Sequence, residues 1–535
     1  MKILIPKYSS GFLGKDMNKE KEKQIAIMDT TLRDGEQTPD IAYSAEEKLQ
    51  LARILLTEVG VDRIEIASTR ASRGEYEAAL LVTQWAKKEN VIQRVEMLGF
   101  CDGKASVDWL LEAGGSVMNL LTKGSERHCR TQLNMTPEDH IKRIEETVSW
   151  AHKNKVIVNA YLEDWSNGVR DNFDYVARLI EAHHRFGVKK IYLADTLGIF
   201  SPDDITHYVG LMIDTWPDLR FEYHGHDDYG LSTANCIAAI NAGVEGIHTS
   251  VNGLGERAGN SSLAEVVAAI EDHTPYKTKV NESRLAAVSL LVETFSGKIL
   301  AANAPILGSD VFTQTAGIHA DGDAKGELYA SLLAPQRFGR ERRYALGKLS
   351  GKASLEHNLE KLGVSLSEDN RKQVLERIIE LGDKKHTVVP EDLLMIIADV
   401  LKTPEEQLIR IESYNVVVSS NEIPQASVTV NFRGKSAHAM GTGDGGYNAF
   451  MTALKIAMQE HGFELPHLSD YRVRIPPSGR TDALVETFIR WDKEGETGFS
   501  TLGVDSDQIG AAVIATEKML NIIAHEAGSL NVKSS

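Results

Sequence analysis

Residues 25–60 read IAIMDTTLRDGEQTPDIAYSAEEKLQLARILLTEVG and combine the signals of one β-strand followed by one α-helix. The apolar run Ile25–Met28 has the length and composition of a buried strand. Ser44-Ala-Glu-Glu47 is a capping box, which marks a helix start. Leu51 and Leu55 then recur four residues apart, as one face of a helix requires, and the segment ends on a glycine, which favours a helix C-cap.

The same unit recurs as far as residue 270. Regular alternation of strands and helices indicates a parallel sheet, and eight such units in about 250 residues are typical of a (β/α)8 TIM barrel. An open doubly wound sheet is the alternative, but the even spacing favours closure. The expected strands are Ile25–Met28, Val61–Ile66, Arg94–Leu98, Ser116–Leu121, Val156–Leu162, Lys190–Ala194, Leu219–Tyr223 and Gly246–Ser250.

After residue 270 the α/β alternation ends, and the sequence pattern changes first to helices and then to the α+β pattern of a C-terminal module. Helical spacing in Leu290–Leu300 and Arg371–Leu381 predicts a helical linker region, and the Gly- and charge-rich segment Phe312–Lys352 between them is long enough to indicate a functional loop region. The expected organisation is an N-terminal lead-in at 1–23, a TIM-barrel catalytic domain at 24–275, helical linker subdomains at 276–404, a C-terminal α+β module at 405–527 and a tail at 528–535.

The C-terminal module contains a weak internal duplication. Ala426–Arg433 leads to Gly443–Met458, and Ala483–Trp491 leads to Val504–Met519. Each half is a strand, a glycine-containing loop and an Ala-rich helix. Two matching halves predict a compact α+β module with an internal pseudo-twofold.

Charge and cysteine content narrow the class of protein. Lys and Arg total 59 against 76 Asp and Glu, a net charge of −17. This argues against nucleic acid or an anionic membrane as the main partner, although a small anionic substrate needs only a few local cations. Cys101, Cys129 and Cys236 form no CxxC pair, which indicates a reducing compartment. The N-terminus lacks the apolar core of a signal peptide, so a cytoplasmic protein is predicted.

Polar residues follow the expected strands at the end where barrel chemistry occurs. Side chains of His224 and His226 point to one face of a strand, and Asp34 follows the first strand. Two histidines and a carboxylate with open positions suit a divalent metal that also binds substrate oxygens. The alternative is a pair of structural histidines hydrogen-bonded in the barrel mouth.

Three further charged residues occupy the same mouth. Arg33 next to Asp34 is placed to stabilise an enolate or alkoxide, and Glu65 on the second strand to orient its guanidinium. A structural salt bridge is the alternative. Glu163, after the fifth strand, is a candidate general base or an ordinary rim carboxylate.

Three motifs resemble the isopropylmalate, homocitrate and citramalate synthase family, which belongs to the DRE-TIM metallolyases. They are Asp29-Thr-Thr-Leu-Arg-Asp-Gly-Glu-Gln37, His224-x-His226 and Asn252-Gly-Leu-Gly-Glu-Arg-Ala-Gly-Asn260. Residues 426–519 are similar to the family's C-terminal regulatory domain, so the resemblance covers nearly the whole chain. It implies a Claisen-type condensation of acetyl-CoA with a small α-keto acid.

The resemblance also implies residue roles. It implies a divalent metal (Mg, Mn, Co or Zn), and His319 matches a catalytic histidine that enters the barrel of a partner subunit, which implies a homodimer with an active site completed in trans. The implied metal ligands are Asp34, His224, His226 and Asn260; the implied catalytic residues are Arg33, Glu163 and His319; the implied substrate contacts are Arg33, Gln37, Glu65, Leu98, Leu121, Tyr161 and Thr196.

The keto acid is inferred from the wall of the pocket. Segments around Leu98, Leu121 and Tyr161 are most similar to bacterial (R)-citramalate synthases, in which bulky residues enclose the methyl group of pyruvate. Isopropylmalate synthase with 2-oxoisovalerate is the alternative, and these residues could also be plain barrel core. A C–C lyase of the hydroxymethylglutaryl-CoA type is a distant alternative. That class favours a reactive cysteine in a glycine-rich loop, and this chain has no cysteine after Cys236.

Two residues depart from the family pattern. Asp227 replaces the usual Asn after the second histidine, and Glu327 stands where close relatives have Asn. An extra carboxylate at Asp227 is expected to tighten metal binding or to change the acidity of the metal ligands.

The resemblance of the C-terminal module to a regulatory domain implies feedback inhibition by a branched-chain amino acid. The inhibitor is expected to be isoleucine if citramalate is made and leucine otherwise.

Overall fold

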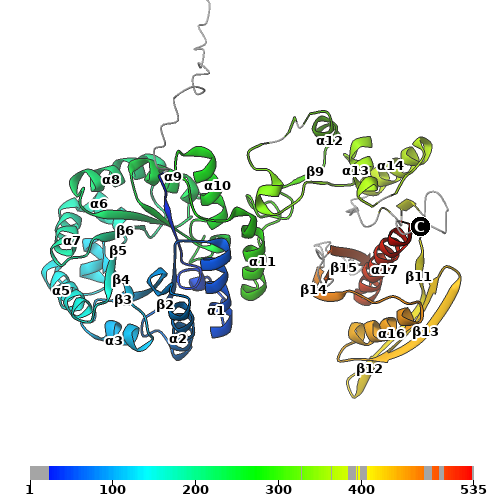
Figure 1. Ribbon diagram of the computed structural model, residues 1–535, viewed down its shortest axis with the longest axis horizontal. Coiled ribbons are helices and arrows are strands. Elements are labelled where there is room, and N and C mark those ends of the chain that lie inside the picture. Colours follow the sequence, from blue (N-terminus) through cyan, green and yellow to red (C-terminus); the bar gives the residue numbers. More distant parts are fainter. Residues whose placement is uncertain are drawn as a thin grey trace, which may run out of the picture. The chain divides into compact units, whose positions relative to one another are not determined.

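The computed structural model contains a closed barrel of eight parallel strands, β1 to β8 in chain order, with β1 paired to β8 (Figure 1). It describes residues 23–326, 328–329, 331–362, 364–383, 393, 396–397, 407–474, 485–492 and 499–532. The strands are β1 (Ala26–Asp29), β2 (Arg63–Ser68), β3 (Val95–Phe100), β4 (Val117–Lys123), β5 (Ile157–Glu163), β6 (Lys190–Asp195), β7 (Arg220–Gly225) and β8 (Gly246–Thr249). The predicted TIM barrel is confirmed, and the open sheet is excluded.

Helices cover the outside of the barrel. The capping box at Ser44 is formed, with Ser44 and Glu47 exchanging side-chain and backbone hydrogen bonds. Gly60 follows with a positive φ of 80° and ends the unit. The helices are α1 (Ala45–Ile54), α2 (Arg73–Lys88), α3 (Ala105–Glu112), α4 (Glu126–Thr131), α5 (Pro137–Lys153), α6 (Trp165–Asp171), α7 (Phe173–Arg185), α8 (Pro202–Thr215), α9 (Ser232–Ala242) and α10 (Leu263–His273).

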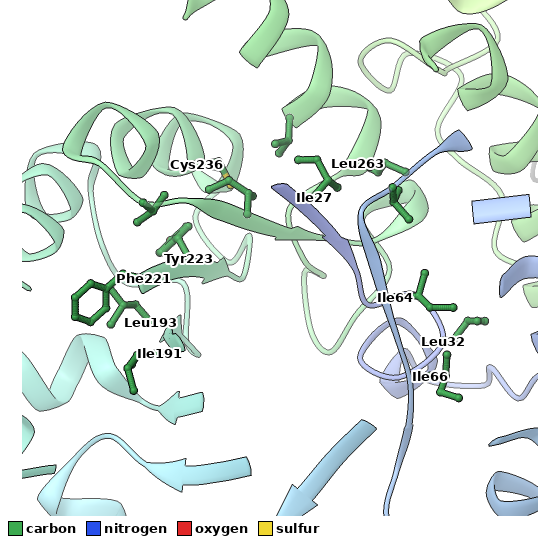
Figure 2. Packing of buried hydrophobic residues seen from close by; sticks show 14 of the residues in the cluster. Ile27, Leu32, Ile64, Ile66, Ile191, Leu193, Phe221, Tyr223, Cys236 and Leu263 are labelled. Atoms are coloured by element: carbon green, nitrogen blue, oxygen red, sulfur yellow. The ribbon is translucent and has the colours of Figure 1, made fainter. Parts of the chain in front are cut away.

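The two faces of the barrel strands differ in chemistry. Alternate strand residues point outward into an apolar layer under the helices, such as Phe221 and Tyr223 of β7 (Figure 2). The residues between them point inward, and several are charged: Glu222 and His224 on β7 are both buried. The barrel interior therefore contains buried charged groups, and these charges must be paired.

A buried ion cluster lies in this interior near the N-terminal ends of the strands. Arg63 of β2 contacts Glu96 at 3.0 Å and Glu222 at 2.6 Å, and it donates to the hydroxyl of Tyr192 at 2.9 Å. Lys190 lies 3.3 Å from Glu222. Burial would lower the pKa of Arg63, but the two carboxylates outweigh it and hold the pKa well above its usual range. Arg63 is thus held as a cation between two buried carboxylates.

Replacing Arg63 by methionine is expected to lower the free energy of unfolding by about 3–5 kcal/mol, because two buried carboxylates lose their cation. Urea unfolding at neutral pH measures the change. Arg220→Met, which removes an exposed arginine 3.6 Å from Glu245, is the matched control and is expected to cost under about 1 kcal/mol. Equal losses in the two variants would contradict the cluster's structural role.

Acid is expected to weaken the same cluster. Burial would raise the pKa of Glu222, but Arg63 outweighs it, so the pKa lies below its ordinary value of 4.5. A carboxyl group whose pKa is lower in the folded state than in the unfolded state stabilises the fold fully at pH values above its unfolded-state pKa. This stabilisation is lost as the pH falls from there toward the folded-state pKa. The free energy of unfolding therefore decreases below about pH 4.5, and less so in Glu222→Gln.

The barrel unit ends at Phe312 and also includes Ser331–Glu341. Helix α11 (Leu285–Ser296) stops at Ser296, because Gly297 adopts a φ of 68° and caps it. The sequence prediction of a helix to Leu300 was wrong at that end. A short helical turn, Pro335–Phe338, belongs to the same unit.

The second unit begins at Thr313 and includes the C-terminal module. Its first part contains β9 (Thr313–Gln314), α12 (Gly317–Ala324), β10 (Arg343–Tyr344), α13 (Lys352–Lys361) and α14 (Glu368–Asp383). The last of these is the helix predicted around Arg371–Leu381. Residues 1–22 of the lead-in expected at 1–23, Glu327 and most of the linker from residue 384 to residue 406 lie outside the described residues.

The C-terminal module has two halves of the same order. Each half is a three-stranded antiparallel sheet followed by a helix. The duplicated sequence predicted one strand, a loop and the helix of each half, and the three-stranded sheets were not predicted. The first comprises β11 (Ile409–Ser419), β12 (Glu422–Phe432), β13 (Lys435–Thr442) and α16 (Gly446–Glu460); the second comprises β14 (His467–Arg474), β15 (Val485–Asp492), β16 (Phe499–Asp505) and α17 (Gln508–Val532). Helix α17 continues into the segment expected to be a tail. Within the described residues, no helix is both long and apolar enough to cross a membrane.

A candidate metal and catalytic site at the barrel mouth

Three predicted metal ligands converge at the C-terminal end of the barrel. One ligand atom from each of Asp34, His224 and His226 lies within 4.8 Å of the others, and all three residues are buried. His224 Nε2 is 3.0 Å from an oxygen of Asp34. The two histidines belong to β7 and the residue after its end, whereas Asp34 lies in the turn after β1, where its N–H donates to the Thr30 carbonyl at 2.8 Å.

Two of the donor groups at this site, His226 and Asp34, are in the protonation state that a divalent cation requires. Burial lowers the pKa of His226 to about 4, so its ring is neutral at neutral pH. Burial would raise the pKa of Asp34, but Arg33 and His224 outweigh it and keep the carboxylate ionised. Among the described residues, buried Nδ1 of both histidines and Oδ1 of Asn260 have no hydrogen-bond partner. Two imidazoles, a carboxylate and an amide oxygen are a donor set that fits a divalent metal.

Asn260 is brought to the same place by the segment after β8. It pairs with His226 through an isolated bridge, and its amide nitrogen donates to the Leu254 carbonyl at 2.9 Å. This hydrogen bond fixes which end of the amide is free, since the oxygen is the end without a partner. Asn260 therefore has a buried acceptor oxygen without a partner on a residue whose backbone pairs with that of His226.

Arg33 is held on three sides beside the acidic ligand. Its Nε donates to Glu65 at 2.6 Å, Nη1 lies 3.1 Å from Asp34, and Nη2 donates to the Tyr161 hydroxyl at 3.2 Å. Burial would lower the pKa of Arg33, but Asp34 and Glu65 outweigh it and raise the pKa above its ordinary value. Because a guanidinium has five N–H groups, one on each terminal nitrogen remains for a ligand.

Glu65 is itself fixed by residues that sequence reasoning missed. Asn119 donates to the second oxygen of Glu65 at 2.7 Å, and Asn159 donates to Asn119 at 3.0 Å. Both asparagines lie on inward positions of β4 and β5 and are buried. The available signal was a single amide side chain within each otherwise apolar strand.

An apolar wall lies beside Arg33. Leu98 of β3, Leu121 of β4 and Tyr161 of β5 belong to one small cluster, backed by Met28, Tyr192 and Ala194. Leu121 and Tyr161 are direct neighbours in the sheet register. This cluster is separate from the larger apolar layer under the helices, so the three wall residues are not part of the main core.

Glu163 pairs with a lysine that the sequence analysis also missed. Lys123 and Glu163 are register partners at the ends of β4 and β5, and their side chains form an ion pair. The Lys123 side chain is 8 % exposed and that of Glu163 is 22 % exposed. The carboxylate is thus open to the mouth and held by a buried cation.

The remaining predicted residues are distributed as follows. Thr196 accepts a hydrogen bond from the Asp164 backbone at 2.8 Å, and Gln37 is exposed in the turn after β1. Asp227 accepts a hydrogen bond from Ser232 at the start of α9 at 2.8 Å, so its carboxylate serves that helix and is not among the clustered ligand groups. His319 lies on α12 in the second unit, where its ring is 4.3 Å from that of Tyr329.

Comparisons with known proteins agree with this arrangement. Residues 24–292 match the HMGL-like family profile, residues 306–386 a homocitrate synthase post-HMGL domain-like profile, and residues 387–524 the LeuA allosteric (dimerisation) domain. The (R)-citramalate synthase CimA of Methanocaldococcus jannaschii is 31 % identical over 505 residues, 93 % of this chain and 99 % of that relative.

Two further proteins are similar to this chain. The probable 2-isopropylmalate synthase of Methanopyrus kandleri is 33 % identical over 503 residues, which are 94 % of this chain and 98 % of that relative. The solved HMG-CoA lyase of Bacillus subtilis is 24 % identical with a TM-score of 0.47, covering 52 % of this chain and 95 % of that one. Since the full-length relatives exceed 30 % identity over nearly the whole chain, the protein belongs to the citramalate and isopropylmalate synthase family of condensing enzymes, with a LeuA-type allosteric domain.

Proposed function

We propose that the enzyme joins acetyl-CoA and pyruvate to give (R)-citramalate and CoA, the first step of the pyruvate route to isoleucine. The observation that carries the choice of keto acid is the apolar wall of Leu98, Leu121 and Tyr161 next to Arg33. Bulky side chains at these positions leave room for a methyl group and clash with a branched one, and overpacking is strongly unfavourable.

Each residue at the barrel mouth has its own role in the proposed condensation. A divalent ion held by Asp34, His224, His226 and Asn260 would supply a Lewis acid for the keto carbonyl. Arg33 donates its two remaining N–H groups to the oxygen on which negative charge develops. Glu163 accepts a methyl proton from acetyl-CoA. The resulting enolate carbon bonds to the keto carbon of pyruvate, and the keto oxygen takes up the proton that Glu163 accepted. Water then hydrolyses the thioester: its oxygen stays in the new carboxylate, one proton leaves on the CoA thiol and the other is released.

Lys123 is expected to matter for the proton transfer. Lys123→Met leaves Glu163 without its cation and without a fixed orientation, and removal of a positioning contact for a general base reduces turnover by about 10–100-fold. Thiol release from acetyl-CoA measures the effect. Arg130→Met, which breaks the exposed pair with Glu126, is the control and is expected to retain activity. Full activity of Lys123→Met would contradict this role.

The keto acid is tested with a panel. Thiol release from acetyl-CoA is expected to be faster with pyruvate than with 2-oxoisovalerate as the keto acid. Leu121→Ala is expected to shift the ratio of the two rates toward 2-oxoisovalerate by about tenfold or more, since each methyl group accommodated is worth ~1–3 kcal/mol. Faster turnover with 2-oxoisovalerate in the parent would favour 2-isopropylmalate synthase. Cleavage of hydroxymethylglutaryl-CoA without condensation would favour a lyase.

The LeuA-type domain supports a proposal on assembly and regulation. We infer a homodimer in which His319 of one chain completes the active site of the other, with isoleucine as the feedback inhibitor. Mixing His319→Ala chains with His226→Ala chains is expected to restore part of the activity, because one kind of site in the mixed dimer is then intact. No restoration would contradict completion in trans.

A further inference from the structure

A lysine is buried beneath the turn that carries Arg33. Lys48 is the fourth residue of α1, and its side chain is 1 % exposed. It lies on the helix face that also buries Leu51 and Ala52, where an amphipathic helix ordinarily has apolar residues. Because lysine is almost never fully buried unless it is paired, an ammonium here indicates a role that an apolar side chain could not fill.

The Lys48 ammonium has one acceptor for each of its three N–H groups. It lies 3.4 Å from the Leu32 carbonyl oxygen and 2.5 Å from a carboxylate oxygen of Glu36, and it pairs with the carboxylate of Glu75 in the first turn of α2. Leu32 and Glu36 belong to the turn after β1. One buried cation therefore ties this turn to two helices.

The contact with Leu32 acts on the backbone of Arg33. The Leu32 carbonyl and the Arg33 N–H are the two ends of one planar peptide unit. Lys48 holds the oxygen of this unit, and its N–H donates to the Thr30 carbonyl at 3.0 Å. The Leu32 side chain packs in the apolar layer under the helices (Figure 2). The peptide plane in front of Arg33 is thus fixed at both ends.

Glu36 holds the chain on the other side of Arg33. One of its carboxylate oxygens meets Lys48, and the other accepts the Tyr43 N–H at 2.8 Å. Arg33 stands between Leu32 and Glu36, so its backbone is held on both sides by the same ammonium. The side-chain contacts described above fix the guanidinium, whereas the Lys48 contacts fix the point from which that long side chain starts.

We propose that Lys48 is a positioning residue for the condensation: its buried ammonium fixes the turn around Arg33 and so aims the two remaining N–H groups of the guanidinium at the developing oxyanion. This inference rests on the proposed function, in which Arg33 stabilises that charge. A misplacement of about 1 Å at a catalytic group can cost about 100-fold in rate, so the backbone of Arg33 matters as well as its side-chain contacts.

Kinetics of paired variants test the proposal. Lys48→Met keeps a long side chain without the ammonium and is expected to lower kcat about tenfold. KM for the keto acid should stay within about twofold, because Arg33 acts on charge that develops in the transition state. In an Arg33→Lys background, Lys48→Met is expected to lower kcat by less than about twofold, since the group that it positions is gone. Glu36→Gln, a milder change that keeps an acceptor, is expected to lower kcat about threefold.

Hydrogen–deuterium exchange of the full chain gives a readout that needs no substrate. The N–H groups of residues 33–35 all donate to the Thr30 carbonyl, and in Lys48→Met they are expected to exchange about tenfold faster or more, while the rest of the barrel keeps its rates. Arg94→Met is the matched control. Arg94 donates to three backbone carbonyls ahead of β2, at the opposite end of the barrel, and its loss is expected to leave kcat and the exchange of residues 33–35 unchanged.

Two results would overturn the positioning role. Equal losses of kcat from Lys48→Met in the parent and in Arg33→Lys would show an effect that does not pass through Arg33. Unchanged exchange at residues 33–35, or a rise shared by the whole barrel, would show that Lys48 does not hold the turn locally. Absence of condensation with every keto acid would instead refute the proposed function, and the exchange measurement would still decide whether Lys48 fixes the turn.

Discussion

Replacing His226 by alanine is expected to abolish condensation, with a loss of more than about 1000-fold in kcat, since Lewis-acid stabilisation is worth several kcal/mol. His226 is one of three clustered ligand groups, and its neutral ring has an Nδ1 without a partner among the described residues. The measurement is thiol release together with metal content after gel filtration, and both are expected to fall.

The control for this experiment is a histidine outside the mouth. His207→Ala changes an exposed residue of α8 and is expected to keep both metal and activity. Persistence of turnover in His226→Ala with metal retained would show that the ligand set is assigned wrongly. Loss of turnover with full metal content would instead give His226 a role in catalysis and not in binding.

Replacing Arg33 by lysine is expected to lower kcat by about 10²–10³-fold, the usual cost of removing one oxyanion donor. Lysine keeps the charge that Asp34 and Glu65 require, so the fold should survive. It cannot reproduce three simultaneous contacts on Nε, Nη1 and Nη2 and still direct two parallel N–H groups at a substrate. Steady-state kinetics with pyruvate measure the loss.

The same change at an exposed arginine supplies the control. Arg73 has a side chain that is 91 % exposed, and Arg73→Lys is expected to have no effect on kcat. A loss at Arg33→Lys confined to KM would mean that Arg33 binds ground state and transition state alike, and the oxyanion role would be withdrawn.

The fold was predictable because its signals are local and repeated. Short apolar runs, capping residues and even spacing specify strands and helices without knowledge of distant contacts, and all eight barrel strands were found at their expected places. The end of α11 was misplaced because Leu300 continues the apolar period, whereas Gly297 breaks the backbone.

The site was only partly predictable, since a side chain's partner across the barrel leaves no mark on its own segment. His224 and His226 carry a spacing signal. Lys123 and Asn119 look like ordinary strand residues until β5 is placed beside β4 and the side chain of Glu65 on β2 is placed against Asn119. The same holds for Asp227, whose carboxylate was expected near the metal and instead binds the start of α9.

Closure of the barrel also has a consequence for how the enzyme matures. The hydrogen bond from the Thr30 hydroxyl to the Thr249 carbonyl joins positions 219 residues apart, and β1 gains its second neighbour only through this seam. Contacts of such long range are formed late in folding. A chain still emerging from the ribosome therefore keeps Asp34 apart from His224 until nearly the whole barrel has been synthesised, so the three clustered ligand groups come together only in a late step.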